Sequence, residues 1–169
     1  NPVARHLLAA CSGQDIPPRA DDAFVESIFD EYAENSDTKL VQSLAYRGPE
    51  YVAAALPTHL LAARELRVLD AGCGTGLCGP VLAPYAAQLT GVDLSANMLA
   101  RARARGGYDH LVKAELGEYL TNQVQAFELV VIADVLIYFG ALDGVFAAAR
   151  AALEHEGLLV FTIETRVAD

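Results

Sequence analysis

Three glycines alternate with other residues in the segment Asp70-Ala71-Gly72-Cys73-Gly74-Thr75-Gly76, which follows the short apolar run 66–70. Glycine adopts backbone conformations that other residues avoid, and it lets a ligand approach the main chain closely. When such a loop leads from a strand into a helix, ligands bind beside it, at the carboxyl end of the strand. The segment is therefore predicted to bind a ligand rather than to form a plain tight turn.

The residues around this loop favour a nucleoside ligand that carries no phosphate. The dinucleotide fingerprint requires a third glycine at the sixth position counted from Gly72, and that position is Leu77. Asp70 stands two residues before Gly72, where its carboxylate would repel a pyrophosphate but attract a cationic amine or sulfonium. An NAD-dependent oxidoreductase is therefore disfavoured.

A second acid, Asp93, ends the next apolar run, residues 89–93. A carboxylate in this place can accept hydrogen bonds from both hydroxyls of a ribose. It could equally cap a helix that we expect to begin near Ala96. Taken together with the glycine loop, Asp93 favours an adenosine-type ligand.

The elements that must position these residues alternate along most of the chain. Five apolar runs are predicted strands: 66–70, 89–93, 111–114, 127–133 and 157–163. Helical patterns cover 79–87, 96–105 and 141–153 between them. This alternation predicts an α/β fold with a mostly parallel sheet and helices on both of its faces.

The first third of the chain is predicted to be helical. Residues 1–20 look like an arm, and helices are expected over 22–34, around 40–44, over 49–56 and in a further turn at 60–61. We expect residues 1–64 to form an arm and helical cap and residues 65–169 to form the ligand-binding core, within one structural domain.

Composition narrows the partners and the compartment. The net charge is −10, and the one basic cluster, Arg101, Arg103 and Arg105, fits a solvated helix face, so no nucleic acid partner is expected. The longest apolar run, 129–142, is interrupted by an acid and is too short to span a bilayer. Three cysteines argue against a disulfide framework and for a cytoplasmic location, and their spacing predicts no metal site.

Two segments resemble a known family. Val68 to Gly76 resembles motif I of class I S-adenosylmethionine-dependent methyltransferases, and Gly91 to Leu99 resembles the segment that follows it in many small-molecule members. The resemblance covers about residues 66–165. Upstream, Phe29 to Ala33 and Tyr46 to Glu50 resemble a bacterial group of predicted methyltransferases associated with TPR repeats.

The resemblance implies a Rossmann-like methyltransferase fold with an N-terminal helical cap. The family sheet normally has seven strands, of which the last two form an antiparallel hairpin. Since we count five, we expect the last two strands to be absent from this chain.

The resemblance also implies S-adenosyl-L-methionine as the cofactor and S-adenosyl-L-homocysteine as its product. The glycines would line its methionine and ribose portions, Asp70 would face its amine, and Asp93 would hold the ribose hydroxyls. Leu94 would pack on adenine, and Glu115 would lie near the adenine amino group or simply on the surface. The full predicted cofactor-binding set is Asp70, Ala71, Gly72, Gly74, Gly76, Asp93, Leu94, Glu115, Leu116, Tyr32 and Arg47.

The roles of four residues are hypotheses. Asp134 follows the fourth predicted strand, where methyl group and acceptor should meet, so it is the catalytic candidate; a helix cap is the alternative. Tyr138 either lines the acceptor pocket or packs in the core. Tyr32 would pack near the methionine end and Arg47 would pair with its carboxylate, or they are a core aromatic residue and a solvated arginine.

The predicted function is methyl transfer to a small-molecule acceptor. Displacement at a sulfonium mainly requires that acceptor and methyl group be held in line. None of the four histidines falls at a predicted strand end, so Asp134 is the base to test where one is needed. The alternative function is a non-catalytic cofactor-binding or protein-interaction module.

Overall fold

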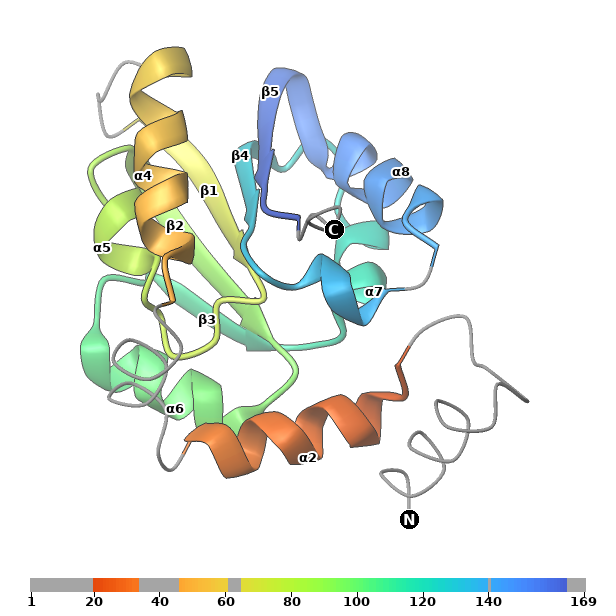
Figure 1. Cartoon of the computed structure of the whole chain (residues 1–169). Helices are drawn as coiled ribbons and strands as arrows, with labels where there is room; N and C mark the ends of the chain where they lie inside the picture. The colour runs from red at the N-terminus through yellow and green to blue at the C-terminus, as the bar shows by residue number, and fades with distance from the viewer. Residues whose placement is uncertain (1–19, 34–45, 61–64, 140, 164–169) are drawn as a thin grey trace, which may run out of the picture.

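A single parallel sheet organises the molecule. The computed structural model describes residues 20–33, 46–60, 65–139 and 141–163, with the side chains of 31–33 and 57–59 left aside. Within these residues the sheet has five strands in the order β3-β2-β1-β4-β5, all parallel (Figure 1). The strands are β1 (Leu66–Ala71), β2 (Ala86–Asp93), β3 (His110–Lys113), β4 (Phe127–Ile132) and β5 (Leu153–Phe161). The predicted Rossmann-like fold is confirmed.

Helices cover both faces of the sheet, which explains why the strands are apolar without strict alternation. Successive residues of a strand point to opposite faces, and in β1 both Val68 and Leu69 are fully buried. Val68 packs in the core beneath α4 (Gly48–His59) and α5 (Gly79–Leu82). Leu69 packs in the core beneath α7 (Leu116–Thr121) and α8 (Asp143–Ala152).

The strand order reverses beside β1. The chain moves outward from β1 through β2 to β3, and then crosses back to β4 on the other side of β1. In open α/β sheets the crevice for a ligand opens at such a reversal, beyond the carboxyl ends of the strands. A ligand site is therefore expected beside the residues that follow β1 and β4.

Helix α2 (Asp22–Ala33) lies at this carboxyl end of the sheet and packs against α6 (Ala96–Arg105) (Figure 1). The hydroxyl of Ser95 donates to the carboxylate of Asp30 on α2 at 2.5 Å. Near the other end of the site, Phe29 of α2 meets the ring of Tyr138 edge-on, with centroids 5.3 Å apart. Helix α2 thus bridges the two sides of the crevice.

Several element boundaries differ from the prediction. The helix expected over 79–87 ends at Leu82, because Pro84 has no N–H to donate to the preceding turn; β2 then starts at Ala86. Helix α4 continues through Pro57, where a break was expected. Strand β5 begins at Leu153, directly after α8, instead of at residue 157.

Two elements were not predicted, and some predictions cannot be compared. The short α7 and the 3₁₀ turn η1 (Leu136–Tyr138) occur where no periodic pattern was noted. Residues 1–19 of the arm expected over 1–20, the helix around 40–44 and Leu61 lie outside the described residues.

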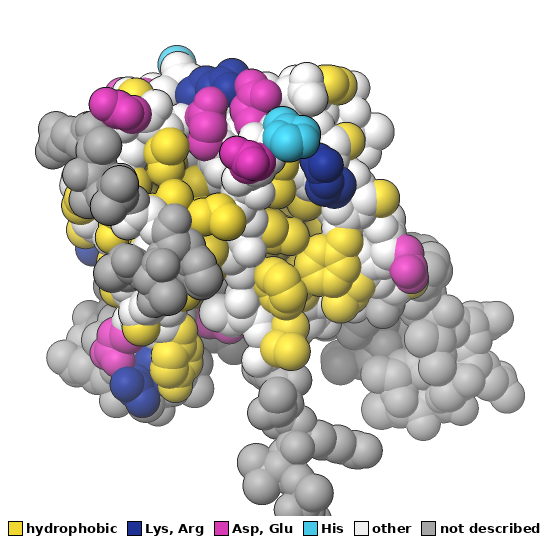
Figure 2. All heavy atoms as spheres, turned by 90° about the horizontal axis from the view of Figure 1, so that it is seen from above, with side chains coloured by type: hydrophobic (Ala, Val, Ile, Leu, Met, Phe, Trp, Pro, Cys, Tyr) yellow, Lys and Arg dark blue, Asp and Glu magenta, His cyan; other side chains and the backbone are white. Residues whose placement is uncertain are grey.

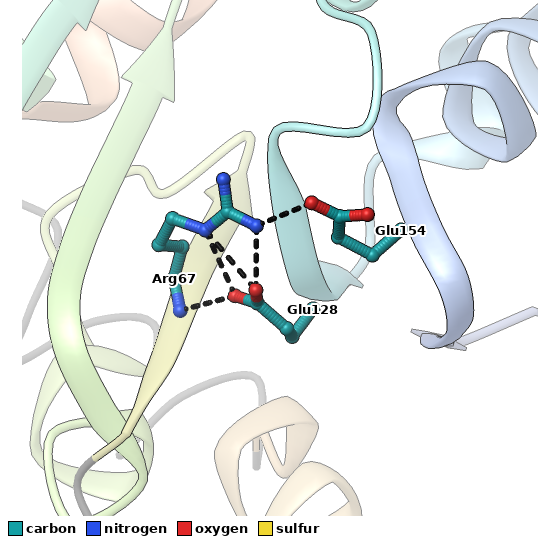
Figure 3. A network of polar contacts seen from close by, with 3 residues as sticks. All are labelled: Arg67, Glu128 and Glu154. Carbon is teal, nitrogen blue, oxygen red and sulfur yellow. Dashed lines mark hydrogen bonds and ion pairs between the residues drawn. The ribbon is translucent and has the colours of Figure 1, made fainter.

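One arginine ties three strands together at the end of the sheet opposite the crevice. Arg67 of β1 makes an ion pair with Glu128 of β4 at 2.5 Å and with Glu154 of β5 at 2.7 Å (Figure 3). The backbone N–H of Arg67 also donates to Glu128 at 2.7 Å. These contacts raise the pKa of Arg67 and lower the pKa of Glu128. They fix the register of β1, β4 and β5 far from the site.

Strand β5 forms one edge of the sheet within the described residues. Phe161 and Ile163 are exposed there, and Phe161 lies against the ring of Phe146 on α8, with centroids 5.2 Å apart. Seen from above (Figure 2), apolar side chains gather near the middle of one face, beside a group of charged side chains.

None of the helices in the described part of the chain is long and apolar enough to cross a membrane.

Candidate functional site

A cavity of about 420 Å³ opens at the carboxyl ends of the strands. Residues that directly follow β1, β2, β3 and β4 all contribute to its wall, as the strand reversal leads us to expect. Its size is in the range of small-molecule sites. The predicted site residues that line it are Asp70, Gly72, Gly74, Asp93, Leu94, Glu115, Leu116, Asp134 and Tyr138.

The charge of the wall is entirely negative among the described residues. Five carboxylate residues line the cavity, and no lysine, arginine or histidine does: the acids are Asp22, Asp70, Asp93, Glu115 and Asp134. Such a wall repels phosphate groups and favours a ligand with positive charge. The remaining wall is largely apolar, with Phe29, Val25 and Phe139 among its residues.

Two glycines of the loop after β1 have different surroundings. Both have positive φ angles, 79° at Gly72 and 52° at Gly74. A Cβ on Gly72 would overlap the side chain of Val135, whereas a Cβ on Gly74 would meet nothing within 4 Å. Gly72 therefore lets the loop pack against the end of β4, and Gly74 leaves its side of the cavity open.

The carboxylate of Asp93 holds this loop in place. One oxygen accepts a hydrogen bond from the N–H of Gly74 at 2.8 Å, and the other accepts one from Ser95 at 2.9 Å. The cap of α6 is Ser95, whose hydroxyl accepts from Met98, so Asp93 is not the helix cap. Each carboxylate oxygen can accept a further bond. Asp93 can thus receive ribose hydroxyls while it fixes the loop.

The carboxylate of Asp70 is almost fully buried, with 1% of its surface exposed. It accepts a hydrogen bond from the hydroxyl of Tyr108 at 2.5 Å. The pKa of Asp70 is raised to about 7: burial raises it most, the bond from Tyr108 lowers it, and nearby Asp93 raises it. A cation in the cavity would stabilise the ionised form of this acid.

Asp134 is held at the end of β4 by a reciprocal pair of bonds. Its N–H donates to the hydroxyl oxygen of Thr162 at 2.8 Å, and that hydroxyl donates to the Asp134 carboxylate at 2.8 Å. Its φ of 55° is a conformation that aspartate tolerates better than most residues. Tyr46 lies beside it: burial, and then the nearby thiol of Cys78 and the carboxylate of Asp134, raise the pKa of Tyr46.

The sequence and fold of this chain are similar to those of known methyltransferases. Residues 69–161 match the family model described as a methyltransferase domain. The chain belongs to this family. A solved structure, an S-adenosylmethionine-dependent methyltransferase from Mesorhizobium loti, is similar with a TM-score of 0.54 and 32% identity, covering 68% of this chain and 55% of that one. The predicted family is confirmed.

Two curated relatives resemble this methyltransferase domain. A malonyl-[acyl-carrier protein] O-methyltransferase of Enterobacter lignolyticus is 36% identical over 110 residues, which are 65% of this chain and 43% of that protein. The chloroplastic magnesium protoporphyrin IX methyltransferase of Arabidopsis thaliana is 35% identical over 104 residues, 58% of this chain and 33% of that protein. The chain therefore spans less than half the length of these relatives.

The remaining predicted site residues of the methyltransferase domain differ in whether they reach the cavity. Ala71 is buried at the end of β1, and a Cβ on Gly76 would meet Tyr108 and Ala102 rather than the cavity. Arg47 is exposed, and its guanidinium binds Glu50 at 2.7 Å. The side chain of Tyr32 is outside the described residues. Glu115 lines the cavity and also caps α7 by accepting from the N–H of Glu118 at 2.7 Å.

Sequence analysis missed several residues of the site. Tyr46, Cys78 and Asp22 line the cavity of the methyltransferase domain, and Tyr108 binds Asp70 from behind. These residues do not follow a strand, so they could not be predicted from the rule that ligands bind at the carboxyl ends of parallel strands. For Tyr108 a signal existed, because the pair Gly106-Gly107 before it predicts a tight turn.

Proposed function

We propose that this chain is the S-adenosylmethionine-binding core of a methyltransferase that acts on a small-molecule acceptor. The supporting observation is the cavity after β1 to β4, lined by five acids and by no basic residue among the described ones. A nucleoside with a sulfonium and an ammonium fits that charge, whereas a dinucleotide does not. The similar protein from Mesorhizobium loti is an S-adenosylmethionine-dependent methyltransferase, which supports the same cofactor.

The residues of the cavity match the parts of this cofactor. The buried carboxylate of Asp70 would pair with the ammonium group, and Asp93 would accept the ribose hydroxyls. Leu94 and Leu116 offer apolar contact for the adenine ring, and Glu115 would accept from its amino group. All five residues line the cavity. Arg47 has no part in this proposal, because its guanidinium is bonded to Glu50 outside the cavity wall.

Methyl transfer would require no covalent bond between the protein and the methyl group. The bound cofactor supplies a methyl group on an activated leaving group. The chain's own residues hold the acceptor in line and exclude water, and good positioning can contribute roughly 7–11 kcal/mol to lowering the barrier. Asp134, fixed by Thr162, would take a proton from an acceptor hydroxyl or amine where one must be removed.

The acceptor would enter near Asp134, where the wall also includes Phe29, Ile137, Tyr138 and Phe139. This largely apolar wall suits a small molecule with an apolar body. The relatives named above act, by their names, on malonyl-[acyl-carrier protein] and on magnesium protoporphyrin IX, and the second of these supports a small-molecule acceptor. We keep as predictions the absence of nucleic acid and membrane partners, the cytoplasmic location and the link to the TPR-associated group.

Titration calorimetry with S-adenosylhomocysteine and with NAD, side by side, tests the proposal. We expect S-adenosylhomocysteine to bind and NAD to give no heat, because the acidic wall repels its pyrophosphate. Asp93→Asn should weaken S-adenosylhomocysteine binding at least tenfold, while Glu118→Gln, an exposed acid on α7, should leave it unchanged. Equal binding of NAD, or no heat with either ligand, would contradict the assignment.

Product formation separates the two functions that the sequence allows. A methyltransferase must consume S-adenosylmethionine with some acceptor, whereas a non-catalytic module would bind the cofactor and form no product.

A further inference from the structure

The connection between α6 and β3, residues 105–109, packs against the glycine loop. Arg105 donates from Nε to the carbonyl of Thr75 at 3.0 Å. The carboxylate of Asp109 accepts from the N–H of Leu89 at 2.7 Å, and its own N–H donates to the Leu89 carbonyl at 2.9 Å. Both ends of the connection are thus anchored to elements that border the cavity, with Tyr108 between them.

The ring of Tyr108 fills a space that three glycines leave open. A Cβ on Gly76, Gly79 or Gly91 would come within 3.0, 2.9 or 2.9 Å of a ring carbon. These glycines belong to three segments: the loop, α5 and β2. Gly79 and Gly91 lie outside the alternating-glycine motif. The tyrosine ring fills the space at Gly79, and it shares the space at Gly91 with Leu111 and Cys73.

The hydroxyl of Tyr108 emerges from this space at the carboxylate of Asp70, 2.5 Å away. The other titratable groups that face Asp70 are Asp93 from β2, the thiols of Cys73 and Cys78, and the phenol of Tyr46. These groups are acids, thiols or phenols, so among the described residues no cation neutralises Asp70. The bond from Tyr108 is what favours its ionised form.

We propose that Tyr108 is a positioning residue for cofactor binding: it orients the Asp70 carboxylate and keeps it charged for the cofactor's ammonium group. The proposal rests on the proposed function, which supplies the cation. Tyr108 does not line the cavity and would not touch the cofactor, so its effect reaches the ligand only through Asp70.

Loss of the hydroxyl should therefore act in a pH-dependent way. With the bond from Tyr108 in place, the pKa of Asp70 is about 7, because burial raises it by more than the bond lowers it. Without that bond the pKa rises further, so at neutral pH less of the free protein carries the charge that binds a cation. Well above both pKa values the carboxylate is ionised with or without Tyr108, and the difference disappears.

Calorimetric titration of the full chain with S-adenosylhomocysteine, from about pH 6 to about pH 9, tests this. The variants are Tyr108→Phe, which keeps the ring, and Tyr85→Phe, a control on a half-buried tyrosine that packs against the core beneath α4 and α5. The ratio of the dissociation constants of variant and wild type cancels the ligand's own titration. For a pKa rise of about one unit, Tyr108→Phe should weaken binding about tenfold near pH 6 and hardly at all near pH 9.

A third variant separates the charge from the fold. In Asp70→Asn the group cannot titrate, so adding Tyr108→Phe to it should cause no further pH-dependent loss. A loss in Tyr108→Phe that is equal at all pH values would overturn the proposal, because it would indicate a packing role alone. Failure of the wild type to bind S-adenosylhomocysteine would instead overturn the proposed function.

Discussion

Gly72 and Gly74 are two residues apart and both have a left-handed backbone conformation, yet their surroundings in the structure differ. Gly72 makes room for Val135, which follows the neighbouring strand β4, and Gly74 faces open space in the cavity. The sequence marks both residues equally, because the motif shows where glycines stand and not what surrounds them. The one packing partner, Val135, comes from the segment after β4, which the local sequence cannot reveal.

Alanine at each of the two glycines should separate packing from backbone strain. Gly74→Ala should lower the free energy of unfolding by about 1 kcal/mol, the usual strain of a side chain at positive φ. Gly72→Ala should cost about 3 kcal/mol, because Val135 must also move. Denaturant titration of both variants measures the difference, and equal losses would show that the contact with Val135 carries no energy.

The same residue scale explains how much of the site was predictable. Asp70, Asp93 and Asp134 were found because each stands at the end of an apolar run, and the ends of parallel strands meet at one edge. Tyr46 and Tyr108 reach the site from segments that precede or flank the sheet. Only tertiary packing brings their hydroxyls to Asp134 and Asp70.

At the scale of elements, the strands of the sheet were predictable and several boundaries were not. Buried parallel strands must be apolar, so the runs that became β1 and β4 stand out in the sequence. The first residues of β2, Ala86 to Gln88, carry little apolar signal and are at least partly exposed, so the start of this strand was misplaced. Helix α7 has six residues, too few to display a helical period.

The Arg67 network gives a prediction at the element scale. Arg67→Met should lower the free energy of unfolding at pH 7 by about 1 kcal/mol, a modest value because the side chains are partly exposed. Since Arg67 lowers the pKa of Glu128, this stability is present above the unfolded pKa of glutamate and is lost as pH falls through the folded value.

The difference between Arg67→Met and wild type should therefore begin to shrink as pH falls below about 4.3, the ordinary pKa of glutamate. It should be lost once Glu128 is protonated in the folded protein, since Arg67 lowers the pKa of Glu128. Denaturant unfolding at pH 7 and at a pH below the ordinary glutamate pKa measures this difference in the free energy of unfolding. Arg101→Met, on an exposed face of α6, is the control. A loss at pH 7 no greater than that of the control would show that the network does not hold the three strands together.

At the scale of the whole molecule, the fold brings four strand ends and helix α2 around one acidic cavity. The Arg67 network ties β1, β4 and β5 at the opposite end of the sheet. The ion pairs of Arg67 thus hold the strands together at one end of the sheet, and the opposite ends of these strands carry the site. This division explains why binding residues occur in loops that a rigid sheet positions.

The most direct test of the account is a crystal structure of the chain with S-adenosylhomocysteine. We predict the ligand in the cavity after β1 to β4, with its ribose hydroxyls on Asp93, its ammonium group beside Asp70 and its sulfur directed toward Asp134. Density for the ligand at any other surface, or a ligand whose carboxylate end lies against Asp70, would contradict the account.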